Sequence, residues 1–96
     1  IDDICDTAGT LANAAKALKE KKAKAVFAYI THGVLSNPAI ERIERSPIDK
    51  MIITDSIVAR DDVKKCKKIV QLSISRLIGE AIGRITDNRS VSSLFA

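Results

Sequence analysis

The chain has 96 residues, of which 46% are hydrophobic and 29% are charged. This composition is typical of one soluble domain with a modest core, and the length is too short for two. The net charge of +4 is mild, and two Phe, one Tyr and no Trp leave few side chains for base stacking, so no nucleic-acid partner is expected. No apolar run approaches the length of a membrane span and no signal peptide is visible, so no membrane partner is expected either.

The cysteines, Cys5 and Cys66, are far apart in the sequence and have no histidine at a zinc-binding spacing. We therefore expect two reduced thiols in a cytoplasmic protein, and no metal site built from them.

The first twenty residues indicate a cut strand, a loop and a helix. The chain begins with Ile1 rather than Met and reaches an acidic pair at once, so we interpret it as an excised fragment whose first strand was cut just before its functional end. Residues 10–20 predict a helix, because apolar side chains recur on one face. That face consists of Leu11, Ala15 and Leu18. Asp6 or Thr7 is the expected N-cap.

The middle of the chain alternates between strands and a helix. Residues 25–30 (AVFAYI) form a nearly continuous apolar run, which predicts a parallel strand buried on both faces. The dipeptide Asn37-Pro38 places a cap and a first-turn proline before a short helix, in which Ile40 and Ile43 point inward. Residues 50–54 (KMIIT) predict another short buried strand.

The last third predicts one more strand and one more helix. Residues 59–68 are polar and are expected to form a loop with some helical turn, and residues 69–72 (IVQL) predict a strand. The clearest helical stripe of the sequence follows. It consists of Ile74, Leu77, Ile78, Ala81, Ile82 and Ile85. Gly79 and Gly83 lie one turn apart and suggest close packing of this helix. Strands that alternate with helices predict an α/β fold with a parallel sheet and right-handed crossovers.

The stretch DDICDTAGT leads into the first helix, where open α/β sheets bind their ligands. Gly9 lets the backbone approach a ligand closely, and Thr7 and Thr10 add hydroxyl donors. The loop amides and the helix start can therefore hold a phosphate. Asp2 and Asp3 only accept hydrogen bonds, so they suit neighbouring hydroxyl groups. A sugar phosphate, specifically a ribose 5-phosphate unit, satisfies both halves.

Three better-known motifs do not fit this stretch. An EF-hand loop needs acids at alternating positions and a later Glu, a Walker loop needs a GK[ST] ending, and a Rossmann fingerprint needs GxGxxG. A plain structural interpretation stays open, in which Asp6 only caps the helix while Asp2 and Asp3 cluster on a loop.

Several segments resemble one family. DDICDTAGTL resembles the phosphoribosyl-binding loop of the type I phosphoribosyltransferase fold. In order along the chain, AYITHGVLSNPAIERIERS, MIITDSI, KKCKKIVQLSISRLIGEAIGRI and SVSSLF resemble the C-terminal portion of the ribose-phosphate pyrophosphokinases, also called phosphoribosyl pyrophosphate synthetases. The resemblance covers essentially all 96 residues. It implies a truncated phosphoribosyltransferase-like domain over residues 1–96.

The resemblance implies transfer of the β,γ-diphosphoryl group of ATP to the 1-hydroxyl of ribose 5-phosphate, which gives phosphoribosyl pyrophosphate (PRPP) and AMP with the assistance of Mg²⁺. It assigns ribose 5-phosphate binding to Asp2, Asp3, Asp6, Thr7, Ala8, Gly9 and Thr10. The family's ATP-binding residues, its metal-binding histidine and its catalytic lysine and arginine lie upstream of the matching portion. We therefore expect no catalytic residue and no metal ligand in this chain, and no PRPP synthesis by it alone.

The family also implies regulation and assembly. Its C-terminal segment helps to form an allosteric site for phosphate and ADP between subunits of a homo-oligomer, dimers within hexamers. That segment maps onto Ser90, Val91, Ser92, Leu94 and Phe95, for which plain tail packing is the simpler alternative. A non-catalytic regulatory relative is an alternative function, although the intact sugar-phosphate loop favours the enzyme. A PRPP-consuming transferase or a repressor of the same fold would not explain SVSSLF.

A few remaining residues invite a functional role. His32 is expected to be a structural residue of the THG turn, and the lysines between 64 and 68 are expected to be a solvated surface run. Phe27 and Tyr29 are expected in the core. Lys22 stands where the family often has Gly, so the first helix is expected to end differently.

Overall fold

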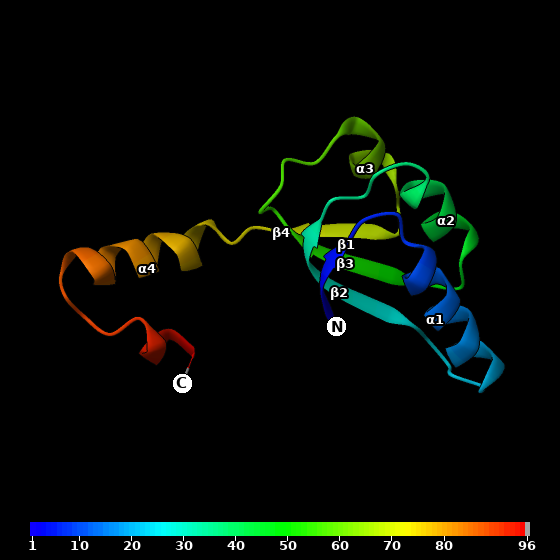
Figure 1. Cartoon of the computed structure of the whole chain (residues 1–96), viewed down its shortest axis with the longest axis horizontal. Coiled ribbons are helices and arrows are strands. Elements are labelled where there is room, and N and C mark those ends of the chain that lie inside the picture. Colours follow the sequence, from blue (N-terminus) through cyan, green and yellow to red (C-terminus); the bar gives the residue numbers. More distant parts are fainter. Residues whose placement is uncertain (96) are drawn as a thin grey trace.

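A computed structural model describes residues 1–95 and shows an α/β architecture built on one parallel sheet (Figure 1). The strands are β1 (Asp2–Cys5), β2 (Phe27–Gly33), β3 (Lys50–Thr54) and β4 (Ile69–Leu72). They lie side by side in chain order, and each neighbouring pair is parallel. The parallel sheet predicted from the alternation of strands and helices is therefore confirmed.

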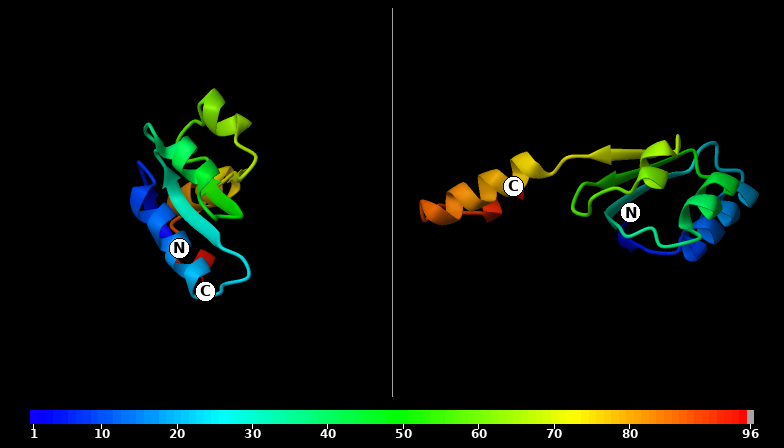
Figure 2. Two further views of the ribbon diagram at one scale, coloured as in Figure 1. Left: turned by 90° about the vertical axis from the view of Figure 1, so that its right-hand side faces the viewer. Right: turned by 90° about the horizontal axis from the view of Figure 1, so that it is seen from above.

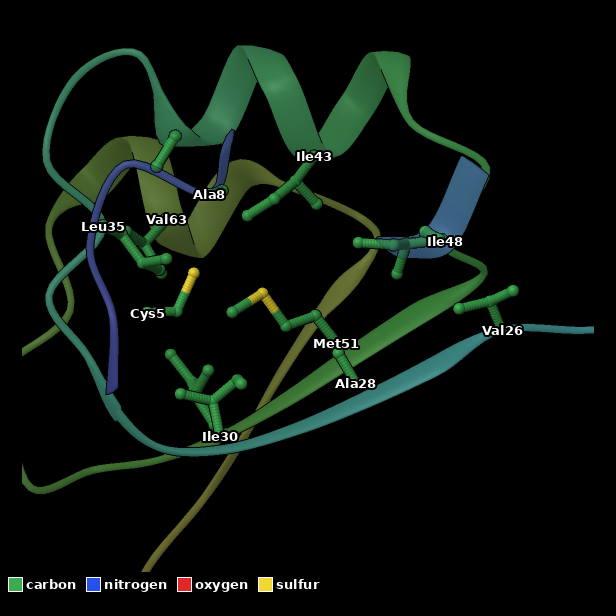
Figure 3. Close-up of a cluster of buried hydrophobic side chains, with 13 residues drawn as sticks. Cys5, Ala8, Val26, Ala28, Ile30, Leu35, Ile43, Ile48, Met51 and Val63 are labelled. Carbon is green, nitrogen blue, oxygen red and sulfur yellow. The ribbon is translucent and has the colours of Figure 1, made fainter. Parts of the chain in front are cut away.

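Three helices connect the strands and pack on one face of the sheet. They are α1 (Gly9–Glu20), α2 (Ala39–Arg45) and α3 (Asp61–Lys65). The predicted loop at 59–68 thus contains a short helix, and the remaining connections match the expected order. The core between these helices and the sheet is aliphatic (Figure 3). Its fully buried large side chains are Leu35, Ile43, Ile48 and Met51.

The opposite face of the sheet is open, which corrects the prediction of strands buried on both faces. Along β2, Ala28 and Ile30 are buried, whereas Phe27 and Tyr29 are 55% and 51% exposed. Phe27 and Tyr29 are therefore not core residues. The alternation follows from the two-residue period of a strand, because only one face is covered by helices in the described residues.

Helix α1 ends in a Schellman motif that is built around a lysine. Lys22 has a φ of 67°, in the left-handed region that glycine adopts most easily. Its N–H donates to the Lys19 carbonyl at 2.9 Å, and the Ala23 N–H donates to the Leu18 carbonyl at 3.0 Å. This pair of bonds satisfies two helix-terminal carbonyls. Lys22 therefore ends α1 in the same way as a glycine would, but its backbone is strained there.

Helix α2 begins at Ala39, with Pro38 at the N-cap position, and its C-terminal end is held by a lysine from a different segment. Lys68 Nζ donates to the carbonyl oxygens of Ser46 at 2.8 Å, Glu44 at 3.1 Å and Ile43 at 3.4 Å. A cation is favourable where unpaired helix carbonyls point. Lys68 is half-buried, so the expectation that the whole lysine run is solvated is wrong for this residue.

The last helix, α4 (Ser75–Thr86), projects from the end of β4 as a separate arm (Figure 2). It has no buried residue, and Ile82 and Ile85 are 59% and 65% exposed. A Cβ placed on Gly79 or Gly83 would meet nothing within 4 Å. The helical stripe was correctly predicted, but the close packing suggested by the two glycines is not found in the described residues. Among residues 1–95, no helix combines the length and apolarity that a membrane crossing requires.

Candidate functional site

The loop between β1 and α1 has an unusual backbone at Ala8. This residue is buried and adopts φ 63° and ψ 10°, a left-handed conformation that costs a residue with a Cβ about 1–2 kcal/mol. It occupies the N-cap position of α1 and makes no side-chain capping bond, so the predicted caps Asp6 and Thr7 are wrong. Gly9 is not in a positive-φ conformation. The left-handed residue of this loop is therefore Ala8 and not the neighbouring glycine.

The carbonyl groups around this loop are directed into the protein. The Cys5 carbonyl accepts hydrogen bonds from the N–H groups of Val34 at 3.0 Å and Leu35 at 3.1 Å. The Thr7 carbonyl accepts a bond of 3.1 Å from Arg42 Nη1. The Ala8 carbonyl accepts the first bond of α1, from the Ala12 N–H at 2.9 Å. With their carbonyls occupied in this way, the peptide units of the loop have a fixed orientation.

The loop N–H groups, in contrast, are left available. Within residues 1–95, the N–H groups of Thr7, Gly9 and Thr10 have no hydrogen-bond acceptor. Three donors near one helix N-terminus form an arrangement that suits an anion. The Ala8 N–H is directed at the Cys5 thiol instead, although burial outweighs this bond and raises the pKa of Cys5.

The acidic pair lies in a strand and not in the loop. Asp2 and Asp3 are the first residues of β1, whereas the sequence had suggested that the stretch DDICDTAGT follows the end of a strand. Asp2 Oδ1 accepts a 2.8 Å bond from the Asp3 N–H, and Asp3 Oδ1 accepts a 2.9 Å bond from the Ile4 N–H. The pKa of Asp3 is lowered, chiefly by hydrogen bonding between its side chain and that of Asp2 and next by the Ile4 N–H, with a smaller contribution from the charge of His32.

A cavity of about 540 Å³ is lined by one of these acids, Asp2, and by the loop. Asp2, Asp6 and the residues from 7 to 10 line its polar end, and α1 and β2 contribute apolar side chains such as Leu11 and Ile30. Its volume is within the range of small-molecule sites. Asp3 does not line this cavity, because consecutive residues of a strand point to opposite faces. The structure therefore brings Asp2 and Asp6 together with the loop but directs Asp3 elsewhere.

His32 lies at the neighbouring strand end and is paired across the sheet edge. Its Nδ1 is 2.7 Å from Ser56 Oγ, in the loop after β3. Ser56 Oγ also donates to the Thr31 carbonyl at 3.3 Å, and Thr54 Oγ1 donates to the same carbonyl at 2.6 Å. His32 was expected to lie in a turn and to be hydrogen-bonded locally, but it lies in β2 and its partner Ser56 is distant in the sequence.

The C-terminal segment forms a short 3₁₀ helix, η1 (Ser92–Phe95), which follows the α4 arm away from the loop (Figure 1). Arg84 of α4 holds it, because its Nη1 donates to the Ser90 carbonyl at 3.0 Å and to Ser93 Oγ. The Leu94 N–H donates to the Val91 carbonyl at 3.0 Å, and Phe95 is 70% exposed. The tail residues thus lie together, apart from the loop between β1 and α1 (Figure 1).

Sequence reasoning missed Arg42, which contacts the loop from α2. In the sequence it is one charged position of a short amphipathic helix. Its contact with Thr7 depends on how the crossover places α2 beside α1, and no local motif encodes that placement. The described residues contain no cluster of three or more His, Cys, Asp or Glu side chains that could hold a metal ion.

A family model described as "Phosphoribosyl synthetase-associated domain" matches residues 1–96. The chain belongs to this family. The ribose-phosphate pyrophosphokinase of Hyphomonas neptunium is 56% identical over 95 residues, which cover 99% of this chain and 30% of the relative. The ribose-phosphate pyrophosphokinase of Coxiella burnetii is 55% identical with the same coverage.

A solved structure shows the same fold. The crystal structure of phosphoribosylpyrophosphate synthetase from Mycobacterium smegmatis matches with a TM-score of 0.86 at 37% identity, over 91% of this chain and 29% of that protein. The family resemblance and the fold class expected from the sequence are therefore confirmed. The chain spans about 30% of the length of the curated relatives that it matches.

Proposed function

We propose that this chain is the ribose 5-phosphate-binding part of a ribose-phosphate diphosphokinase, which transfers diphosphate from ATP to ribose 5-phosphate and makes PRPP for nucleotide biosynthesis. The observation that carries the proposal is the loop from 6 to 10. The carbonyls of Thr7 and Ala8 accept hydrogen bonds from the protein, while the N–H groups of Thr7, Gly9 and Thr10 have no acceptor within residues 1–95. The names of the relatives support the reaction.

The proposed binding mode follows from the chemistry of the two ends of the ligand. The 5-phosphate accepts hydrogen bonds from the free N–H groups of the loop and from the hydroxyls of Thr7 and Thr10, and the N-terminal dipole of α1 favours its charge. Asp2 lines the same cavity and accepts hydrogen bonds from ribose hydroxyls. Asp3 does not line the cavity, so its proposed contact with the ribose hydroxyls is indirect, through the metal ion.

Mg²⁺ is part of the proposal for the whole enzyme. This ion usually keeps several waters and is bound through one or two carboxylates plus substrate phosphates. The carboxylates of Asp2 and Asp3 are both exposed, so either one fits that partial role. The ion would neutralise charge on the transferred diphosphoryl group.

The other partners are proposed at the level of the whole protein. ATP binds to parts of the enzyme that this chain lacks, and ADP or phosphate binds at a regulatory site to which the tail contributes. The proposed tail residues are Ser90, Val91, Ser92, Leu94 and Phe95. We also propose a cytoplasmic homo-oligomer, in which the open sheet face and the α4 stripe would be covered by further protein.

Titration of the ¹⁵N-labelled chain with ribose 5-phosphate tests the proposal. The amide resonances of residues 6 to 10 are expected to shift, and free ribose at the same concentration is expected to leave them unchanged. Thr10→Val removes one hydroxyl donor and should weaken binding about tenfold, the effect of losing about 1.4 kcal/mol from a hydrogen bond to a charged group. Thr86→Val on the α4 arm is the matched control and should bind as the wild type does. Equal shifts with ribose, or none with ribose 5-phosphate, would contradict the proposal.

A further inference from the structure

We propose that Arg42 is a positioning residue for the loop from 6 to 10, and that Gly9 is glycine because a side chain there would displace the Arg42 guanidinium. The inference rests on the proposed function, and it adds a residue outside the loop that fixes the orientation of the loop's donors. Arg42 holds the Thr7 carbonyl toward α2 with a 3.1 Å hydrogen bond. The N–H groups of Gly9 and Thr10 are then left facing the ligand.

The contact between Arg42 and Gly9 explains why position 9 lacks a side chain. Gly9 has no positive φ, so backbone conformation does not require glycine. A Cβ built on Gly9 would lie 3.2 Å from Arg42 Nη1, the same nitrogen that donates to Thr7. That separation is tighter than ordinary van der Waals contact, so the guanidinium would have to shift by a few tenths of an ångström, which would lengthen its 3.1 Å hydrogen bond to Thr7.

The helix backbone that carries Arg42 is held in place by buried neighbours, although the Arg42 side chain is exposed. Its neighbour Ile43 and the first residue of α2, Ala39, are both fully buried. Lys68 holds the C-terminal end of the same helix through three carbonyls. A side chain projecting from such a fixed helix can hold a flexible loop, because less ordering entropy is lost when the contact forms.

The charge of Arg42 is also uncompensated. Within residues 1–95, Arg42 has no carboxylate within ion-pair distance, whereas Arg45, one turn later on α2, pairs with Glu41 at 2.8 Å. An unpaired guanidinium bonded to the back of the loop raises the electrostatic potential at the loop's N–H groups and favours an anion there. Arg45→Met is therefore a matched control, with the same helix and the same loss of charge but no contact with the loop.

The test compares four variants of this chain by titration with ribose 5-phosphate and by urea unfolding. Arg42→Met keeps the apolar stem, removes the donors, and is expected to weaken binding about tenfold. Gly9→Ala is expected to weaken binding by a similar factor while making the chain more stable to urea, because alanine favours a helix over glycine. Arg42→Lys keeps the charge but not the fork geometry and should fall between wild type and Arg42→Met. Arg45→Met should bind as wild type.

The double variant Gly9→Ala/Arg42→Met decides between coupled and independent roles. If Gly9 acts through Arg42, the double variant binds no more weakly than Arg42→Met alone, a tenfold loss in total. A hundredfold loss would show independent effects and would overturn the proposal, as would wild-type binding by Arg42→Met.

A ligand-free measurement separates this proposal from the proposed function. Backbone ¹⁵N order parameters of residues 7 to 10 are expected to fall in Arg42→Met and in Gly9→Ala but not in Arg45→Met. If the wild type does not bind ribose 5-phosphate, the proposed function fails, and the order parameters still test whether Arg42 orders the loop. Unchanged order parameters in both loop variants would overturn the positioning role.

Discussion

Lys68 provides the sharpest test of how the fold supports the loop, because one ammonium group serves three carbonyls. Its Nζ donates to Ser46, Glu44 and Ile43 at the C-terminal end of α2, the helix that carries Arg42. Lys68→Met keeps the length and the apolar stem and removes the charge. Lys67→Met is the matched control, since Lys67 is exposed and its ammonium makes no hydrogen bond or ion pair in the described residues.

The expected loss of stability is about 2 kcal/mol. A hydrogen bond to a charged group contributes about 1.5–3 kcal/mol, and a cation near a helix C-terminus adds about 0.3–1 kcal/mol. The bonds of 2.8 and 3.1 Å have ordinary lengths, and the third, at 3.4 Å, is long. Because Lys68 is only half-buried, water replaces part of what is lost, so the lower end of the combined range applies.

Urea unfolding followed by far-UV circular dichroism measures this difference, and thermal unfolding should show a lower Tm by roughly 8–16 °C for a domain of this size. Lys67→Met should unfold within about 0.5 kcal/mol of the wild type. If the two methionine variants are equally stable, Lys68 does not hold α2 and the account of that helix is wrong.

Three further predictions concern α1, β1 and the start of α4. Lys22→Gly should raise the free energy of unfolding by about 1 kcal/mol in urea, because it removes left-handed strain at the Schellman position, and an equal or lower stability would contradict that reading. The Cys5 thiol is buried with a raised pKa, so at pH 8 it should react with Ellman's reagent far more slowly in the folded chain than in urea, and equal rates would show that the core around β1 is open. The pKa of Asp55 is lowered, chiefly by the 2.9 Å bond from the Ile74 N–H, so this contact is present above the ordinary carboxyl pKa of about 3.9 and is lost as pH falls through the lower folded value. Hydrogen exchange at Ile74 should therefore quicken at low pH in the wild type relative to residues elsewhere, and Asp55→Asn should show no such dependence.

The order of strands and helices could be predicted because each segment carries its own periodic signal. The helix at 10–20 and the strands at 50–54 and 69–72 agree with the structure within one residue at each end. What covers the sheet could not be predicted, since an apolar run such as AVFAYI is compatible with burial of one face or of both. The exposed Phe27 and Tyr29 show that only one face is covered in this chain.

The candidate site was predictable in its position but not in its geometry. The residue types of DDICDTAGT indicated an anion-binding loop, and within residues 1–95 the loop does present N–H groups that have no acceptor. The left-handed residue is Ala8, which no propensity favours, because the surrounding structure holds it there. Asp3 does not line the cavity that contains Asp2, and Arg42 comes from a crossover that the sequence does not specify.

A crystal structure of this chain with ribose 5-phosphate tests the central claim most directly. The account predicts the phosphate oxygens within hydrogen-bond distance of the N–H groups of Thr7, Gly9 and Thr10, with the ribose toward Asp2. A phosphate bound away from this loop, or loop N–H groups turned inward onto protein acceptors, would contradict it.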